Sequence, residues 1–111
     1  MSQIENVDVA TAQRLVEDGA LLLDVREDAE FAAGHAPHAR HVPLSDVPDV
    51  VEQLPREELI VCVCRSGSRS ARAGAFLLEQ GLRAVNLEGG MTAWHAAGAP
   101  LVAEDGEPYV A

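Results

Sequence analysis

The sequence predicts an α/β fold, a single domain whose parallel sheet is flanked by helices on both faces. Two runs that are apolar except for Asp24 and Glu58, at residues 20–25 and 58–63, have the composition of strands that are buried on both faces of a sheet. Amphipathic segments alternate with these runs, and several of those segments end at a glycine, as helices often do. Strands that alternate with helices imply crossover connections, and therefore a parallel sheet.

The first half of the chain is expected to begin with a helix over residues 8–19, which Asp8 can cap and Gly19 ends. The apolar run at 20–25 then forms the first strand. The predicted elements that follow are a short helix over 26–34 closed by Gly34, a short strand within 40–44, and a helix over 45–54 with Ser45 as its candidate cap.

The second half is expected to open with the second buried strand, at 58–63. Its predicted elements after that strand are the longest helix, over 68–81 and ended by Gly81, a third strand over 83–87, and a turn with a last short helix over 89–98. The tail at 99–111 is weakly patterned, and no element is predicted in it.

Length and composition indicate one folded domain over residues 1–111, with its core at about 7–98. The chain has 111 residues and 48% hydrophobic residues, which is not the composition of a disordered protein. All eight cationic residues are arginine, and the net charge is 8 − 18 = −10. This acidic excess argues against nucleic acid or an anionic membrane as the main partner.

Targeting and redox features predict a cytoplasmic setting. No stretch approaches the length of a membrane span, and the N-terminus lacks the basic and apolar regions of a signal peptide. The two cysteines, Cys62 and Cys64, are too few for a disulfide framework and too close in sequence for an ordinary bridge. We therefore expect a reduced compartment.

The segment at residues 64–69, CRSGSR, follows the second buried strand and leads into the longest helix. Ligands of parallel sheets bind beyond the carboxyl ends of the strands, and a helix N-terminus offers unpaired N–H groups with a positive partial charge. A loop of small residues with Gly67 at its centre can turn these groups toward Cys64 and favour its nucleophilic thiolate form. Arg65 and Arg69 add positive charge, which would attract an anion such as thiosulfate or phosphate.

The two cysteines are expected to play different parts. Cys62 lies within the apolar strand and is interpreted as a small core residue. Cys64 is interpreted as the reactive thiol, because a structural thiol needs no arginine or glycine beside it. A metal site built on the sequence CVC is disfavoured, since its spacing is shorter than that of metal-binding cysteine pairs and no second pair exists.

The spacing of the loop separates two chemistries. Cysteine phosphatases place five residues between the cysteine and the arginine that binds phosphate. Here the corresponding position is Ser70 when counted from Cys64 and Ser68 when counted from Cys62. The arginine of this loop, Arg69, comes after four residues. The shorter loop suits a group smaller than a phosphoryl ester, such as a terminal sulfur.

Three segments in order resemble the single-domain rhodanese family of sulfurtransferases. They read LLLDVREDAEFAAGHAPHARHVPL, VCVCRSGSRSARAGAFLLEQG and VNLEGGMTAW, and the resemblance runs from about Val7 to Trp94. One departure is His38, where family members usually have a small residue, often glycine. This difference implies a changed turn and leaves the chemistry untouched.

The resemblance implies a mechanism and its partners. Cys64 would take sulfane sulfur from a small anionic donor such as thiosulfate, become a persulfide, and pass the sulfur to a thiol, cyanide or protein acceptor. The loop N–H groups would hold the charge of the persulfide, so the expected substrate-binding residues are Arg65, Ser66, Gly67, Ser68 and Arg69. No cofactor and no metal are needed for this chemistry.

Several residues outside the loop have structural interpretations beside functional ones. Asp24 and Arg26 end a strand on the same edge as Cys64, where they either support the loop or form a structural ion pair. Glu30 is expected to pair with an arginine, and His35 to be a hydrogen-bonded turn residue. Trp94 is expected to pack on the sheet.

Four functions remain open at this point. The first is a thiosulfate-type sulfurtransferase. The second is a carrier that receives persulfide from one protein and passes it to another, and it would use the same Cys64. A non-catalytic binding module is disfavoured by the intact loop. An arsenate-type reductase is disfavoured because no resolving cysteine lies downstream of Cys64.

Overall fold

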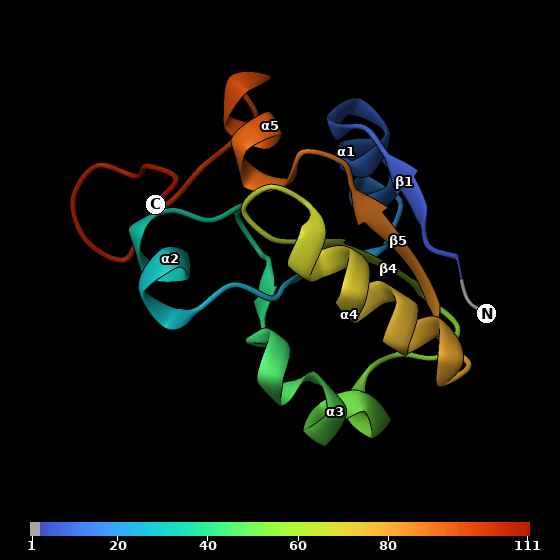
Figure 1. The fold of residues 1–111 in the computed structure, drawn as a ribbon. Helices are drawn as coiled ribbons and strands as arrows, with labels where there is room; N and C mark the ends of the chain where they lie inside the picture. Colours follow the sequence, from blue (N-terminus) through green and yellow to red (C-terminus); the bar gives the residue numbers. More distant parts are fainter. Residues whose placement is uncertain (1–2) are drawn as a thin grey trace.

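The computed structural model describes residues 3–111, so the first two residues of the predicted domain lie outside the described part. Five parallel strands form one sheet in the order β1-β5-β4-β2-β3, with helices on both faces (Figure 1). The strands are β1 Glu5–Val7, β2 Leu21–Asp24, β3 Arg40–His41, β4 Leu59–Val63 and β5 Arg83–Leu87. The helices are α1 Val9–Glu17, α2 Asp28–Ala33, α3 Val47–Val50, α4 Ser68–Glu79 and α5 Gly90–Ala96, with 3₁₀ turns η1 Leu44–Asp46 and η2 Val51–Gln53. The predicted fold class is confirmed.

Two apolar clusters fill the space above and below the sheet. One lies on the α4 face and includes Cys62 and Cys64 together with Ala73 and Leu77 of that helix. The other lies on the opposite face, where α1 and α5 pack and Trp94 is 4% exposed. Side chains of a strand alternate between the faces, which is why the two cysteines lie on the same side. Trp94 packs in the core as predicted, and its indole N–H donates to the carbonyl of Pro100 at 2.7 Å.

The predicted elements agree with the structure except at three places. Strand β1 is an addition: residues before Asp8 were not assigned an element, yet Glu5–Val7 pairs with β5. The expected helix over 45–54 is instead the run η1, α3 and η2, and Ser45 lies inside η1 without acting as a cap. Pro48 lies in the first turn of α3, where its missing N–H leaves no helical hydrogen bond unmade. The helix is interrupted at Val50, whose φ of −116° lies outside the α-helical range.

The third difference concerns the tail. Although its sequence is weakly patterned, it returns to the end of α2 and supplies hydrogen-bond donors there (Figure 1). The N–H groups of Glu104 and Tyr109 donate to the carbonyls of Ala32 and Ala33 at 3.1 and 3.0 Å. Those carbonyls belong to the last turn of the helix and have no partner within it.

Candidate functional site

Cys64 occupies the centre of the carboxyl edge of the sheet. It directly follows β4, the middle strand, and precedes a short loop that enters α4 at Ser68. The side chain is 1% exposed, so the sulfur lies beneath the loop. Gly67 turns the chain into the helix with φ = 113°, a left-handed conformation that favours glycine.

Two groups donate hydrogen bonds to the sulfur of Cys64. The backbone N–H of Gly67 lies 3.1 Å from Sγ, and the hydroxyl oxygen of Ser70 lies 3.3 Å from it. Burial acts to raise the pKa of Cys64. The hydroxyl of Ser70 and the N–H groups of Ser70, Gly67 and Ser66 outweigh that effect, so the pKa lies below the ordinary thiol value. The loop therefore stabilises a thiolate without a neighbouring histidine.

Cys62 has the opposite environment. It is 0% exposed, and desolvation together with the nearby charge of Cys64 raises its pKa to about 12. A thiol with this pKa is almost entirely protonated at neutral pH and is a poor nucleophile. The interpretation of Cys62 as a core residue agrees with this burial.

The start of α5 supports the loop from behind. The N–H groups of Met91 and Thr92 donate to the carbonyls of Cys64 and Arg65 at 2.8 and 3.0 Å. Gly90 adopts φ = 57°, and a Cβ on it would lie against the backbone of Cys64 and Arg65. The close approach of two backbones at this point requires glycine.

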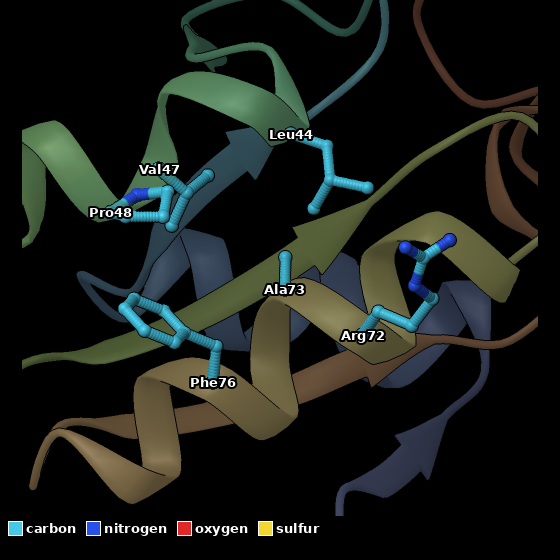
Figure 2. Close-up of a pocket in the computed structure, with 6 residues that line it drawn as sticks. All are labelled: Leu44, Val47, Pro48, Arg72, Ala73 and Phe76. Carbon is cyan, nitrogen blue, oxygen red and sulfur yellow. The ribbon is translucent and has the colours of Figure 1, made fainter.

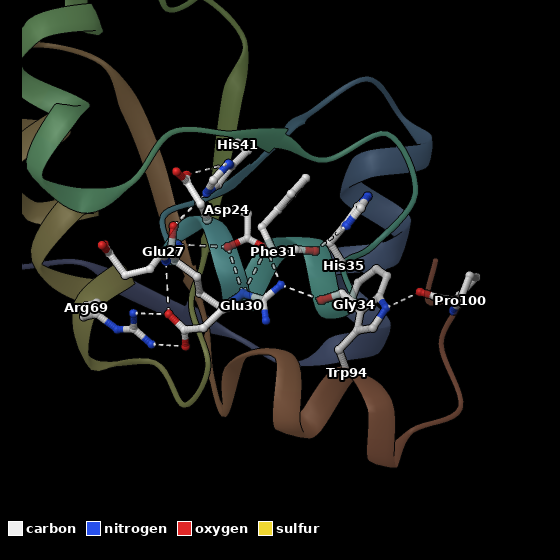
Figure 3. Close-up of polar contacts among 12 residues, drawn as sticks. Asp24, Glu27, Glu30, Phe31, Gly34, His35, His41, Arg69, Trp94 and Pro100 are labelled. Carbon is white, nitrogen blue, oxygen red and sulfur yellow. Dashed lines mark hydrogen bonds and ion pairs between the residues drawn. The ribbon is translucent and has the colours of Figure 1, made fainter. Parts of the chain in front are cut away.

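The side chains of the predicted loop do not all face the sulfur. Arg65, Ser66 and Ser68 are exposed. Arg69 forms a bidentate ion pair with Glu30 of α2, with nitrogen–oxygen distances of 2.7 and 2.9 Å (Figure 3). The predicted pairing of Glu30 with an arginine is confirmed. The guanidinium of Arg69 is consequently held at the side of the loop.

Asp24 and Arg26 form a buried ion pair behind α2. The side chains are 1% and 0% exposed, and the closest nitrogen–oxygen distance is 2.9 Å. Nη2 of Arg26 also donates to the carbonyl of Gly34 at 2.7 Å, which ties the end of β2 to the end of α2. Neither Asp24 nor Arg26 makes a hydrogen bond to Cys64 in the described chain, so their contacts are those of the buried ion pair.

Of two histidines near α2, His35 makes structural hydrogen bonds and His38 has an unusual backbone conformation. The backbone of His35 pairs with that of Val102, and its Nδ1 donates to the carbonyl of Phe31 at 2.7 Å, as expected for a turn residue. His38 has φ = 64° and is the only residue other than glycine with positive φ among residues 3–111. The position that departs from the family pattern therefore has a backbone conformation for which glycine is suited.

A shallow groove lies beside the first turns of α4 (Figure 2). Its volume is about 230 Å³, and it is lined by Leu44, Val47, Pro48, Arg72, Ala73 and Phe76. The guanidinium of Arg72 is the charged group at this groove, whose other lining side chains are apolar. Ala73 belongs to the apolar cluster that includes Cys64, and Leu44 packs against that cluster, so the groove and the thiol share one layer of packing.

Sequence reasoning missed Ser70 and Asn86. Ser70 is 0% exposed and Asn86 is 3% exposed, and their side chains lie 2.6 Å apart beside the sulfur of Cys64. Asn86 interrupts the buried apolar strand RAVNL, and a polar side chain in such a strand needs a hydrogen-bonding partner. That signal was available in the sequence. Ser70 is hidden by its place within an ordinary amphipathic helix.

Comparison with known proteins identifies the family. The model of the rhodanese-like domain matches residues 8–97. The chain belongs to the rhodanese-like family. A sulfurtransferase of Allochromatium vinosum is 41% identical over 97 residues, which cover 86% of this chain and 91% of that protein. The thiosulfate sulfurtransferase GlpE of Pseudomonas fluorescens is 33% identical over 95 residues, covering 85% of this chain and 87% of GlpE.

Solved rhodanese structures share the fold. A rhodanese-related protein from Thermoplasma volcanium superposes with a TM-score of 0.83 at 31% identity, covering 88% of this chain and 97% of that one. The resemblance found in the three sequence segments is thus confirmed. The similar rhodaneses support sulfurtransferase activity in general. Within residues 3–111, no helix is long and apolar enough to cross a membrane, and no group of three potential metal ligands comes together.

Proposed function

We propose that this rhodanese moves sulfane sulfur from a small anionic donor of the thiosulfate type to a thiophilic acceptor through a persulfide on Cys64. The observation that carries the proposal is the environment of the sulfur. Two donors, the N–H of Gly67 and the hydroxyl of Ser70, lie within 3.3 Å of Sγ, and the pKa of Cys64 is lowered. A stabilised thiolate at the end of the central strand is suited to nucleophilic attack.

The first step loads the enzyme. The thiolate of Cys64 attacks the outer sulfur of thiosulfate, and a new sulfur–sulfur bond forms at Sγ. The sulfur–sulfur bond of the donor breaks, and its electron pair leaves with sulfite. The total charge is unchanged, because a thiolate and a dianion become a persulfide anion and a dianion.

The second step delivers the sulfur. A cyanide ion or a thiolate attacks the terminal sulfur of the persulfide, and the sulfur–sulfur bond to Cys64 breaks. Its electron pair returns to Sγ, which regenerates the thiolate. The same donors that stabilise the nucleophile in the first step stabilise the leaving group in the second.

The loop supplies the positive charge and the N–H groups that attract the anionic sulfur donor. The N-terminus of α4, a helix of 12 residues, brings N–H groups and a positive partial charge to the loop. Arg65 is exposed and free to meet an incoming anion, whereas Arg69 already shares its charge with Glu30. We therefore assign donor attraction to Arg65, Ser66, Gly67 and Ser68, and a smaller part to Arg69. A reducing, cytoplasmic compartment would keep both thiols free.

Intact mass measurement tests the proposal. The purified protein is incubated with thiosulfate, beside Cys64→Ser and the matched variant Cys62→Ser. We expect the mass to rise by one sulfur atom in the wild type and in Cys62→Ser but not in Cys64→Ser. Cyanide should then restore the original mass and release thiocyanate. A sulfur adduct in Cys64→Ser would refute the persulfide route through Cys64. The absence of a sulfur adduct in the wild type and in every variant, with every donor tried, would also refute it.

The choice of donor separates the proposed enzyme from a persulfide carrier. The test compares loading of Cys64 by thiosulfate with loading by a protein persulfide at equal concentration. Faster turnover with thiosulfate supports the thiosulfate-type transferase. Loading by the protein persulfide alone would make the chain a carrier that uses the same thiol.

A further inference from the structure

The two donors to Cys64 have a common neighbour on another strand. Asn86 of β5 accepts from the hydroxyl of Ser70 through Oδ1 at 2.6 Å, and it donates to the carbonyl of Gly67 through Nδ2 at 3.1 Å. Ser70 and Gly67 are the residues whose groups lie 3.3 and 3.1 Å from Sγ. One buried amide therefore contacts both residues that hold the sulfur.

The orientation of this amide follows from its partners. The carbonyl of Gly67 only accepts hydrogen bonds, so the side of Asn86 that faces it must be the NH₂ group. The same nitrogen donates to Oδ1 of Asn6 on β1 at 3.0 Å. Oδ1 of Asn86 is left facing Ser70, and a carbonyl oxygen can only accept.

The hydroxyl of Ser70 has one proton and more than one acceptor. Oδ1 of Asn86 lies at 2.6 Å, Sγ of Cys64 at 3.3 Å and the carbonyl oxygen of Gly67 at 3.4 Å. The hydroxyl can donate to one of them at a time. When Cys64 is a neutral thiol, the short bond to Asn86 is satisfied, and the S–H can donate to a lone pair of Ser70. When Cys64 is a thiolate, the amide and the sulfur compete for the same proton.

We propose that Asn86 is a positioning residue that holds both donors in place and competes with the Cys64 thiolate for the hydroxyl proton of Ser70. The competition limits how far Ser70 stabilises the thiolate. In the persulfide the charge moves to the terminal sulfur, and the hydroxyl of Ser70 again donates its hydrogen bond to Oδ1 of Asn86. Ser70 thus acts on the free thiolate, which is the nucleophile of the first step and the leaving group of the second.

The inference rests on the proposed function only in taking Cys64 as the reacting thiol. The variants described below leave the other ionisable residues at this edge of the sheet in place, since none of these residues is substituted. They are Cys62 of β4, Arg65 of the loop, Arg69 of α4 with its partner Glu30 of α2, and the ion pair of Asp24 with Arg26.

The first test is a titration without any sulfur donor. The thiolate absorbance of Cys64 is followed against pH, with the signal of Cys64→Ser subtracted, for the wild type and Ser70→Ala. We expect the midpoint to rise by about one pH unit in Ser70→Ala, because a hydrogen bond to a charged group is lost. Ser45→Ala, which replaces an exposed serine, should leave it unchanged. An unchanged midpoint in Ser70→Ala overturns the proposal.

The second test isolates the competition. Asn86→Leu removes the nearest competing acceptor of the Ser70 hydroxyl and also loosens Gly67, and these two effects on the midpoint have opposite signs. A double-mutant cycle with Ser70→Ala separates them, because only the loosening remains when the hydroxyl is absent. For each background we take the shift in midpoint that Asn86→Leu causes relative to its parent. We expect this shift to be about half a pH unit lower in the background with Ser70 than in the Ser70→Ala background. Equal shifts in both backgrounds would overturn the competition.

The control for folding and the link to function are both measurable. Asn86→Ala replaces the leucine variant if leucine disturbs the fold, since alanine adds no bulk at this 3% exposed position. Far-ultraviolet circular dichroism confirms the fold of each variant before titration. If the titrations follow the expectation while thiosulfate never loads the wild type, the proposed function fails and the role of Asn86 stands.

Discussion

The carboxylate of Glu30 and the guanidinium of Arg69 join α2 to the first turn of α4, next to the loop that follows Cys64, through two parallel hydrogen bonds. The distances are 2.7 Å for Nη1 to Oε1 and 2.9 Å for Nη2 to Oε2. The side chains are 20% and 30% exposed, so the pair is only partly screened by water. The hydrogen bonds from Arg69 lower the pKa of Glu30 to about 2. A segment far away in the sequence thereby sets the position of the loop's second arginine.

Glu30→Gln should lower the free energy of unfolding by about 1 kcal/mol at neutral pH, a value that allows for solvent screening. Glutamine keeps the capping-box bond to the N–H of Glu27 through its oxygen. Its NH₂ group cannot accept from Nη2 of Arg69, so the change removes the charge and one of the two hydrogen bonds to Arg69. Because the folded pKa is below the ordinary value of 4.5, the stabilisation is present above about pH 4.5 and is lost as the pH falls toward about 2. Urea unfolding across this range should show the difference between variant and wild type shrinking with acidity.

The control for this prediction is Glu57→Gln. Glu57 is exposed, and its carboxylate forms no ion pair within the described chain. Its stability difference from the wild type should be small and should not depend on pH in the same way. A constant difference for Glu30→Gln from neutral to acid pH would contradict the assigned role of the ion pair.

Gly90→Ala should disturb the active loop, whereas Gly98→Ala should not. Both glycines have positive φ, 57° and 76°, so alanine is strained by about 1–2 kcal/mol at either site. A Cβ at Gly98 meets no atom within 4 Å, but one at Gly90 would overlap the backbone of Cys64 and Arg65. We expect Gly90→Ala to lose about 1–3 kcal/mol more than Gly98→Ala in thermal or urea unfolding.

The same pair of variants has a kinetic readout. Displacement of the loop backbone should slow persulfide loading in Gly90→Ala, while Gly98→Ala loads at the wild-type rate. Equal stability and equal loading in the two variants would show that α5 does not support the loop as described.

His38→Gly should stabilise the protein by up to about 1.5 kcal/mol. His38 is exposed and has φ = 64°, and an L-residue pays about 1–2 kcal/mol for this conformation. Glycine avoids that cost but loses about 0.5–1 kcal/mol through its freedom in the unfolded chain. Urea unfolding gives the net value. His38→Ala keeps the strain and serves as the control, so a gain in alanine equal to that in glycine would exclude relief of backbone strain as the cause.

Gly34→Ala should release the tail. Gly34 has φ = 178°, which any residue adopts, so alanine brings no backbone strain here. A Cβ at this position would overlap the carbonyl of Tyr109 and lie 2.9 Å from its backbone nitrogen. We expect faster proteolytic cleavage within residues 103–111 and a loss of about 1–3 kcal/mol in the free energy of unfolding. In a chain that lacks residues 103–111, the same substitution should change nothing.

The sequence was sufficient for the elements whose own pattern is strong. The apolar runs of β2 and β4 and the apolar stripe of α4 predict these elements directly, because many apolar residues must be buried together. Strand β1 could not be predicted from Glu5–Val7, since its three residues are mostly exposed and are ordered by pairing with β5. The tail is similar: its backbone groups find partners on α2, and no side-chain pattern encodes them.

The candidate site divides in the same way. Cys64 and the loop could be assigned because strand, loop and helix N-terminus are contiguous, and their electrostatics follow from local chain geometry. The partners of the loop come from elsewhere: Glu30 from α2, Gly90 from α5 and Asn86 from β5. Contacts between distant segments depend on the packing of the whole domain, which residue types alone do not determine.

The end of α2 is held almost entirely from outside the helix. The carbonyls of Phe31, Ala32, Ala33 and Gly34 accept, in that order, from His35, Glu104, Tyr109 and Arg26. A helix of six residues contributes few internal hydrogen bonds, so it has little autonomous stability. Amide hydrogen exchange should therefore report α2 and the tail as one cooperative unit that opens together. Opening of that unit would break the ion pair between Glu30 and Arg69 without unfolding the sheet.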